Sequence, residues 1–189
     1  MTRLWLIRHG PTHQRAMTGW RDVPADLSDR EALARLSAAL PAVPVVSSDL
    51  RRAVETADAI AGDRPRRASD PDLREIDFGD WDGRTADEIS RTDPDLSRAF
   101  WERPGAVAAP NGESWDQMTA RVGAAVDRLA ARDPELVIVA HMGAILSLFP
   151  RAGLTVGEAL GHRLDPLGLS RIETAPGGGW RLVEINRRP

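Results

Sequence analysis

The chain has 189 residues, 42% of them hydrophobic, so we expect a single globular domain over residues 1–189. It contains no Cys, and all 25 basic residues are Arg, which excludes cysteine-nucleophile phosphatases, Schiff-base lysines and the Walker lysine of P-loop enzymes. A net charge of -3 argues against a nucleic-acid surface, and no apolar run approaches the roughly 20 residues of a membrane span. We therefore expect a cytoplasmic protein that binds neither nucleic acid nor a membrane.

Apolar runs alternate along the first half of the chain with segments of helical periodicity. In order, we predict a strand at residues 4–7, a loop at 11–27, a helix capped at Ser28 and closed at Pro41, a strand at 44–47, a helix at 49–61 ended by Gly62, and a long loop with one short edge strand at 63–84.

The second half continues the alternation and ends in a hairpin. We predict helices that open at Thr85, Pro94 and Ser114, a buried strand at 135–140, a helix at 143–149, and paired strands at 169–174 and 180–185. Capping boxes support three helix starts: Ser28 with Glu31, Thr85 with Glu88, and Ser114 with Gln117. Strands separated by helices predict an α/β fold, a three-layer α/β/α sandwich whose central sheet is mostly parallel with an antiparallel edge strand.

Two of the predicted strands lead directly into histidines. Arg8 and His9 follow the first strand, and His141 follows the strand at 135–140. Open α/β sheets bind ligands at the carboxyl ends of their strands, so we expect the two imidazoles to meet at one sheet edge. A guanidinium beside an imidazole at such a position indicates phosphate chemistry, because planar Arg binds phosphate oxygens bidentately.

Four blocks of sequence extend this indication, although each alone is a weak signal. In chain order they are Leu6–Thr12, Ser48–Ala57, Leu73–Gly83 and Val139–Gly143. Together, in this order, they resemble the histidine phosphatase superfamily, the phosphoglycerate-mutase-like enzymes. The resemblance covers residues 4–146, and the segment 85–112 and the final hairpin add little to it.

The resemblance implies a catalytic role for five residues. His9 would be the nucleophile that becomes phosphorylated, and Glu75 the proton donor to the leaving group. Arg8, Arg52 and His141 would hold the phosphoryl group, with His141 protonated beside it. His9 must be neutral at the attacking nitrogen, so we expect its other nitrogen to donate to a fixed acceptor such as a backbone carbonyl.

The resemblance also implies contacts with the substrate. Thr12 matches a phosphate-contacting position, the backbone N–H of Met142 would add another donor, and Thr18 and Gly19 lie in the loop where the family recognises substrate, with His13 and Trp20. We expect neither a metal nor a cofactor, because positioned guanidinium groups can stabilise the charge that spreads over the equatorial phosphoryl oxygens.

Hydrolase and mutase remain alternatives within the family. Residues 18–22 resemble the substrate loop of cofactor-dependent phosphoglycerate mutases, but the loop begins closer to His9 and lacks their asparagine. Residues 85–112 lack tandem arginines, and the chain stops soon after its hairpin, so we expect water to reach the intermediate.

We therefore predict a phosphomonoester hydrolase acting on a small phosphorylated metabolite, such as α-ribazole phosphate, a sugar phosphate or a phosphoglycerate. The alternatives are a cofactor-dependent phosphoglycerate mutase and a non-catalytic module that binds a phospho-ligand. The oligomeric state stays open, with a homodimer as one option.

Overall fold

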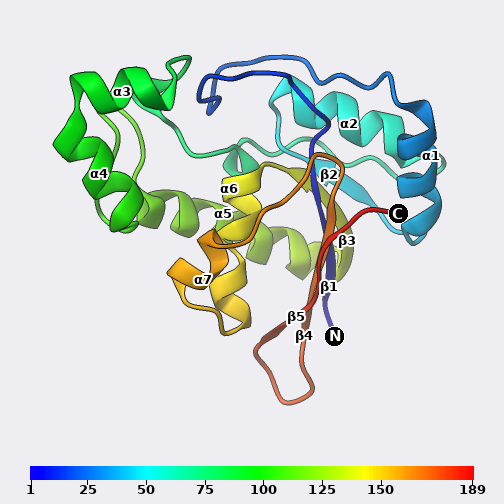
Figure 1. Cartoon of the computed structure of the whole chain (residues 1–189). Coiled ribbons are helices and arrows are strands. Elements are labelled where there is room, and N and C mark those ends of the chain that lie inside the picture. Colours follow the sequence, from blue (N-terminus) through cyan, green and yellow to red (C-terminus); the bar gives the residue numbers. More distant parts are fainter.

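Five strands form one mixed sheet in the order β2-β3-β1-β4-β5 in the computed structural model, which describes residues 1–189 (Figure 1). They are β1 (Arg3–Arg8), β2 (Val45–Ser47), β3 (Glu135–Ala140), β4 (Leu169–Thr174) and β5 (Trp180–Arg187). Strands β2, β3 and β1 pair in parallel, whereas β4 is antiparallel to both β1 and β5. The antiparallel pairing is therefore confined to the edge formed by the β4–β5 hairpin.

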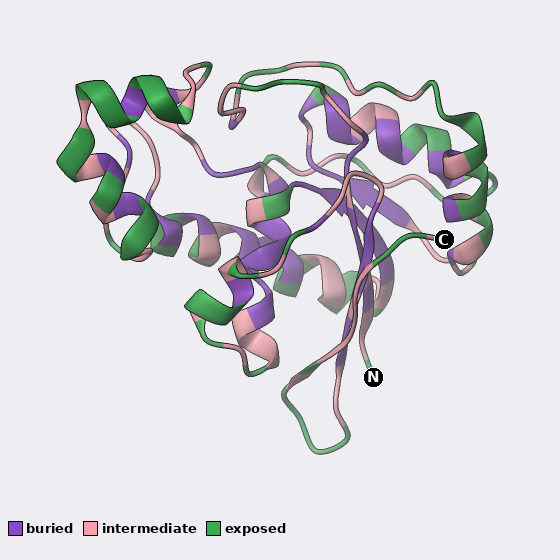
Figure 2. Ribbon diagram, in the orientation of Figure 1, coloured by how far each residue is buried: buried purple, intermediate pink, exposed green.

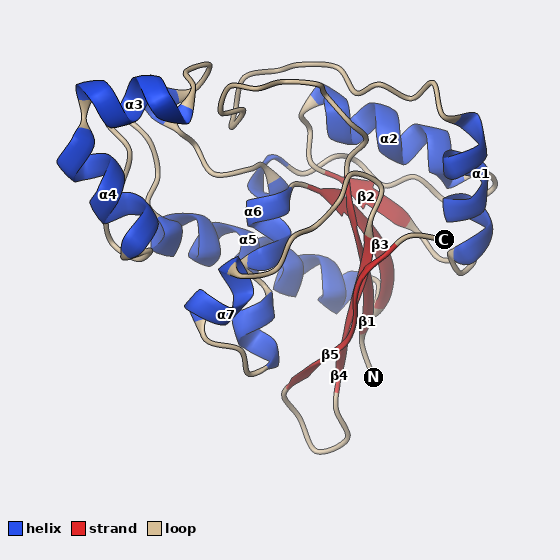
Figure 3. Cartoon of the chain, viewed as in Figure 1, coloured by secondary structure: helices blue, strands red, loops and turns tan.

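Helices pack on both faces of this sheet, as Figure 3 shows. They are α1 (Arg30–Ala39), α2 (Arg51–Ala61), α3 (Ala86–Thr92), α4 (Pro94–Glu102), α5 (Trp115–Arg132), α6 (Met142–Leu146) and α7 (Val156–Leu160). The predicted three-layer α/β/α sandwich is confirmed.

Side-chain alternation along the central strands divides the core into two clusters. Leu6 of β1 and Ile138 of β3 pack with residues of α5 and α6, whereas Ile7 and Val139 pack with residues of α1 and α2. Strand β3 is buried on both faces because α5 and α6 cover one face of the sheet and α1 and α2 cover the other, which explains its continuous apolar run. Figure 2 shows buried strands at the centre of the fold and exposed turns on α3 and α4.

Helix α1 begins one residue later than its sequence pattern indicates. The Asp29 carboxylate accepts a hydrogen bond from the Ala32 N–H at 2.9 Å, so Asp29 is the cap and the capping box of Ser28 with Glu31 is wrong. Ser28 instead donates its backbone N–H to the Asp26 carboxylate in a local turn. The capping boxes at Thr85 and Ser114 are confirmed.

The edge strand predicted within residues 63–84 is also wrong. Only one parallel bridge forms there, between Val45 and Arg66. The rest of the segment is loop with two short 3₁₀ helices, Pro71–Leu73 and Gly79–Trp81. The segment is mostly polar and contains Pro65 and Pro71, and the apolar residues Leu73, Ile76 and Trp81 that it buries lie on loop and 3₁₀ backbone.

The helix predicted at residues 143–149 is shorter than expected. Helix α6 covers Met142–Leu146, and a 3₁₀ helix follows at Phe149–Ala152, where Pro150 cannot continue the α-helical hydrogen bonding. Helix α7, which sequence analysis missed, opens with a capping box of Thr155 and Glu158. No helix in the structure combines the length and apolar character that a membrane crossing requires.

Candidate active site

The carboxyl ends of β1 and β3 lie side by side and bring two histidines together. The strands pair in register, with Arg8 opposite Ala140, so the residues that follow them emerge at the same edge of the sheet. The His9 and His141 rings lie edge to face, with centroids 5.1 Å apart. Both imidazoles are buried.

Hydrogen bonds at both ring nitrogens hold His9 in one tautomer. Its Nδ1–H donates to the Gly10 carbonyl at 2.7 Å, and its Nε2 accepts from the Arg52 Nε–H at 3.2 Å. Burial and, to a smaller extent, the positive charge of Arg52 together lower the pKa of His9 to about 3. The imidazole is therefore neutral, with a lone pair on the nitrogen that faces Arg52.

Arg52 enters the site from the first turn of α2, and its side chain is buried. Its two terminal nitrogens donate to the carbonyls of Arg21 at 3.0 Å and Gly19 at 2.7 Å. Neighbouring Arg51 points to the surface, where it pairs with Glu55. Three fixed acceptors thus orient one of the two consecutive guanidinium groups toward His9.

Arg8 is the second guanidinium of the site. One terminal nitrogen donates to the Leu164 carbonyl, whereas its buried Nε–H has no partner. Burial lowers the pKa of both Arg8 and Arg52, and the charge of Glu75 opposes that effect. Both groups stay charged at neutral pH, because a guanidinium is not deprotonated in proteins.

Glu75 lies against the first turn of α6, and its side chain is fixed by backbone donors. One carboxylate oxygen accepts from the Gly143 N–H at 2.9 Å, and the other accepts from the N–H groups of Ile76 at 2.9 Å and Ala144 at 3.2 Å. A Cβ at position 143 would lie 2.3 Å from the carboxylate, so only glycine allows this approach.

Two residues hold the Glu75 backbone, namely Trp20, which sequence analysis placed in the substrate loop, and Arg121, which it did not assign to the site. The Trp20 indole N–H donates to the Glu75 carbonyl at 2.8 Å, and Arg121 donates to the same oxygen at 3.2 Å. Arg121 also pairs with Glu113 at 2.6 Å. In the sequence, Arg121 has only the pattern of a solvated charge on a long helix, so no local signal identifies it.

His141 is fully buried, and neither ring nitrogen has a hydrogen-bond partner. Burial lowers its pKa well below the usual value, and positive charge on His9 or on Arg52 acts in the same direction. The imidazole is therefore neutral in this structure, whereas sequence analysis expects it protonated beside a bound phosphate. Unpaired polar atoms are costly in a protein interior, so these nitrogens mark a place for a polar group of a ligand.

A cavity of about 200 Å³ opens onto Arg8, His9, Arg52 and Glu75, whereas the fully buried His141 lies behind His9 and does not line it. Of the predicted substrate contacts, Thr12, Thr18 and Met142 lie on its wall, but Gly19 does not. The Gly19 N–H donates to Asp82 and its carbonyl accepts from Arg52, so this residue lies behind the guanidinium. The cavity is lined by Arg8, His9, Thr12, Gln14, Ala16, Thr18, Arg52, Glu75, Phe78 and Met142.

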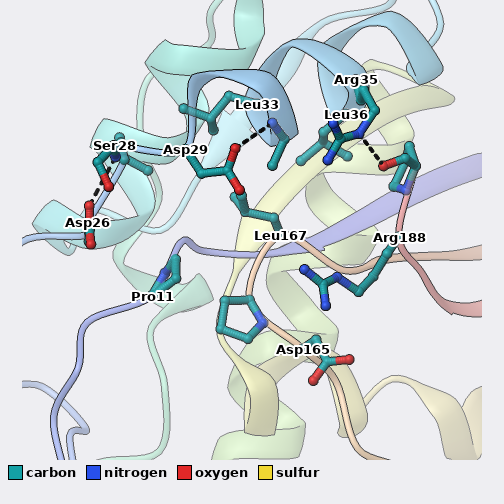
Figure 4. A pocket seen from close by; sticks show the side chains of 14 residues that line it. Pro11, Asp26, Ser28, Asp29, Leu33, Arg35, Leu36, Asp165, Leu167 and Arg188 are labelled. Atoms are coloured by element: carbon teal, nitrogen blue, oxygen red, sulfur yellow. Dashed lines mark hydrogen bonds between the residues drawn. The ribbon is translucent and has the colours of Figure 1, made fainter.

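Two other features lie away from this cavity, one of them a predicted substrate-loop residue. The exposed His13 side chain pairs with Asp26 at 2.7 Å and does not line the cavity. A larger cavity of about 440 Å³ lies between α1, residues 165–167 and the C-terminal segment (Figure 4). Its polar groups are engaged in the fold, since Asp29 caps α1 and Arg35 donates to the Pro189 carbonyl. We therefore place the candidate site at the smaller cavity.

No three His, Cys, Asp or Glu side chains in the structure are grouped so that they could hold a metal ion. The charged groups that converge on the site are the buried guanidinium of Arg52, the half-buried guanidinium of Arg8 and the carboxyl of Glu75, beside two neutral imidazoles. This arrangement can bind a dianion, present a nitrogen lone pair to it and exchange a proton at its edge.

Comparison with known proteins agrees with this geometry. Residues 4–188 match the family model of the histidine phosphatase superfamily, branch 1. The adenosylcobalamin/α-ribazole phosphatase of Escherichia coli is 29% identical over 98% of this chain and 91% of its own length. A bifunctional protein of Mycobacterium tuberculosis is 35% identical over 98% of this chain, which spans only 54% of that relative. The solved structure of a mycobacterial glucosyl-3-phosphoglycerate phosphatase is 29% identical, with a TM-score of 0.83 and 100% of both chains covered.

Proposed function

The chain belongs to the histidine phosphatase superfamily, branch 1, and we propose that it hydrolyses a phosphomonoester of a small metabolite through a phosphohistidine on His9. The observation that carries the proposal is the state of His9. Its Nδ1–H is fixed by the Gly10 carbonyl, and its Nε2 lone pair faces the buried guanidinium of Arg52. An imidazole held in this way is ready to attack phosphorus.

Substrate binding begins with an exchange of hydrogen bonds. The Arg52 Nε–H, which donates to His9 in this structure, would turn to a phosphoryl oxygen and release the Nε2 lone pair. The unpaired Arg8 Nε–H and the unpaired His141 nitrogens would contact the remaining oxygens. Because the bound dianion opposes the effect of burial, it favours a proton on His141.

Phosphoryl transfer then joins His9 Nε2 to phosphorus while the bond from phosphorus to the leaving oxygen breaks. The electron pair of that bond goes to the leaving oxygen, which takes a proton from Glu75 and departs as an alcohol. The mechanism therefore requires that Glu75 carry a proton before this step. General acid help of this kind contributes on the order of 10² to 10⁴ in rate.

Hydrolysis of the phosphohistidine reverses the role of Glu75. A water molecule attacks phosphorus from the side that the alcohol has left, and Glu75 takes its proton. The bond to Nε2 breaks, inorganic phosphate leaves, and His9 is neutral again. Arg8 and Arg52 supply the positive charge in both steps, so the proposal needs no metal ion.

The segment 85–112 favours hydrolase over mutase. It forms α3 and α4 and contains the isolated arginines Arg91, Arg98 and Arg103, none of which lines the cavity. A phosphoglycerate mutase needs cations for the substrate carboxylate as well as for the phosphate. The relatives named α-ribazole phosphatase and glucosyl-3-phosphoglycerate phosphatase also support a phosphatase with a small substrate.

The test is release of inorganic phosphate from 4-nitrophenyl phosphate and from a panel of phosphometabolites that includes 3-phosphoglycerate and α-ribazole phosphate. We expect turnover by the wild type and a loss of at least about 10⁴-fold in His9→Ala, because the nucleophile is gone. The matched control is His162→Gln, at a histidine that packs against Phe149 away from the cavity.

Two outcomes would contradict the proposal. Isomerisation of phosphoglycerate that depends on bisphosphoglycerate and outpaces phosphate release would identify a mutase. Tight binding of phosphate esters without turnover would identify a binding module.

A further inference from the structure

A second cavity, of about 100 Å³, opens beside the one that contains His9. Glu75, Phe78 and Met142 line both cavities, so the two lie side by side at the proposed proton donor. Nine of the twelve residues that line the second cavity are hydrophobic. They come from four places in the chain, namely the loop after Glu75, the α4 region, the start of α5, and helices α6 and α7.

Aromatic side chains form one wall of this cavity. We call Phe78, Phe100, Trp101 and Trp115 the aromatic wall. Phe100 and Trp101 pack edge to face with ring centroids 4.9 Å apart, and Phe78 lies 6.3 Å from Trp101. Trp101 is nevertheless 51% exposed, so a large apolar surface stays uncovered at the mouth of the site.

The second cavity contains no cation. Glu75 is its only charged residue, and it contains neither Arg nor His. A carboxylate or a second phosphate placed there would lose its hydration and gain no partner, and it would lie beside another carboxyl. The cavity therefore disfavours anionic leaving groups such as the glycerate part of a phosphoglycerate.

The position of Glu75 determines what enters this cavity. The leaving oxygen must come within hydrogen-bonding reach of its proton donor, and Glu75 lies on the boundary between the two cavities. With the phosphoryl group beside His9, the carbon attached to the leaving oxygen points past Glu75 toward the aromatic wall.

We propose that the second cavity binds the leaving group of the substrate and selects an uncharged, apolar alcohol with a single ring or a branched alkyl chain. The size sets an upper limit: a dry apolar cavity of roughly 150 Å³ holds benzene, and this cavity of about 100 Å³ would enclose part of a ring while the rest lies against the exposed Trp101. The inference rests on the proposed function, since a leaving group exists only if the ester is cleaved.

The experiment compares 2-phenylethyl phosphate, ethyl phosphate and 3-phosphoglycerate as substrates of the wild type. The first two are esters of primary alcohols, so the proton that Glu75 supplies matters similarly for both. We expect kcat/KM for 2-phenylethyl phosphate to exceed that for ethyl phosphate by about 30-fold, as burial of one ring implies, and to exceed that for 3-phosphoglycerate by more.

Substitutions in the second cavity test whether that cavity is the source of the selectivity. Trp101→Ala should lower the ratio of the first two kcat/KM values by about tenfold, whereas Trp180→Ala, on β5, should leave that ratio unchanged. Val107→Arg adds a cation at a half-buried position of the second cavity and should shift the preference toward 3-phosphoglycerate.

The outcomes separate this inference from the proposed function. Phosphate release from 3-phosphoglycerate as efficient as from 2-phenylethyl phosphate, or an unchanged ratio in Trp101→Ala, would overturn the inference and leave the phosphatase intact. Absence of phosphate release from every ester would overturn the proposed function itself.

Discussion

The floor and the aromatic wall of the candidate site differ in how they are held. The floor consists of Arg8, His9, Arg52 and His141, which follow strands or open a helix and are fixed by backbone groups and burial. The aromatic wall depends on packing between loops and helices, and α3 and α4 lie away from the sheet (Figure 1). Hydrogen bonds to the backbone fix the direction in which a side chain points, whereas apolar packing fixes only the volume that the side chains fill.

This difference separates the two tasks of the site. Phosphate is the same group in every substrate, so a rigid floor with buried charges is sufficient for all of them. The leaving group varies, and a wall of packed side chains can change without disturbing the floor. Glu75 joins the two regions, because its carboxylate is fixed by α6 while it lines both cavities.

Among the changes that compare the floor with the aromatic wall, the largest effect should come from removing the proton that Glu75 supplies. In Glu75→Gln we expect cleavage of ethyl phosphate to fall by about 10³-fold, because an alkoxide needs a proton to leave. Cleavage of 4-nitrophenyl phosphate should fall far less, since its leaving group is stable as an anion. Steady-state kcat values for both esters measure the difference, and equal losses would refute the acid role.

A smaller loss should follow from a conservative change in the floor. Arg52→Lys keeps the charge but cannot reach His9 and the carbonyls of Gly19 and Arg21 together, so kcat/KM should fall by about 10² for every ester. Arg51→Lys is the matched control, since its exposed side chain only pairs with Glu55. A loss limited to apolar esters would show that floor and wall are not separate.

The smallest expected effect concerns stability. The folded state keeps His9 neutral down to about pH 3, whereas the unfolded chain protonates it near pH 6.5, so the free energy of unfolding should fall as pH drops from about 6.5 toward 3. Above about pH 6.5 the His9 imidazole is neutral in both the folded and the unfolded state, so this loss of stability is absent there. Each such histidine adds a slope of up to about 1.4 kcal/mol per pH unit, and the lowered pKa of His141 acts in the same direction.

Urea unfolding between pH 4 and 7 measures this slope. His9→Gln should flatten it, and Trp101→Ala, a change in the wall, should leave it as in the wild type. A wild-type stability that does not change over this range would contradict the burial of a neutral His9.

Arg8, His9 and His141 could be predicted from local sequence patterns, whereas Arg52 was assigned only through the family resemblance. Continuous apolar runs identify β1 and β3, and a histidine follows each of them. Local hydrogen bonds also determine the helix starts at Thr85 and Ser114, where both partners of the capping box lie within four residues. The N-cap of α1 was predicted wrongly because the Asp26 carboxylate accepts a hydrogen bond from the Ser28 N–H, which places Ser28 in a turn before the helix.

Contacts between residues far apart in the sequence could not be predicted from any local sequence pattern. The support of Glu75 by Arg121 joins residues 46 positions apart, and the role of Gly19 as an acceptor for Arg52 joins residues 33 apart. The aromatic wall combines a loop, a helix and a helix start whose side chains have only the pattern of ordinary packing residues.

By itself, the sequence determined the alternation of strands and helices, the family resemblance and the residues that follow the strands, because backbone periodicity and strand direction are properties of neighbouring residues. Only the tertiary structure decided which nitrogen of His9 is free, what holds Glu75 and where an apolar cavity meets the proton donor. These properties depend on burial and on the partners that burial imposes, and a residue acquires them only when distant parts of the chain pack against it.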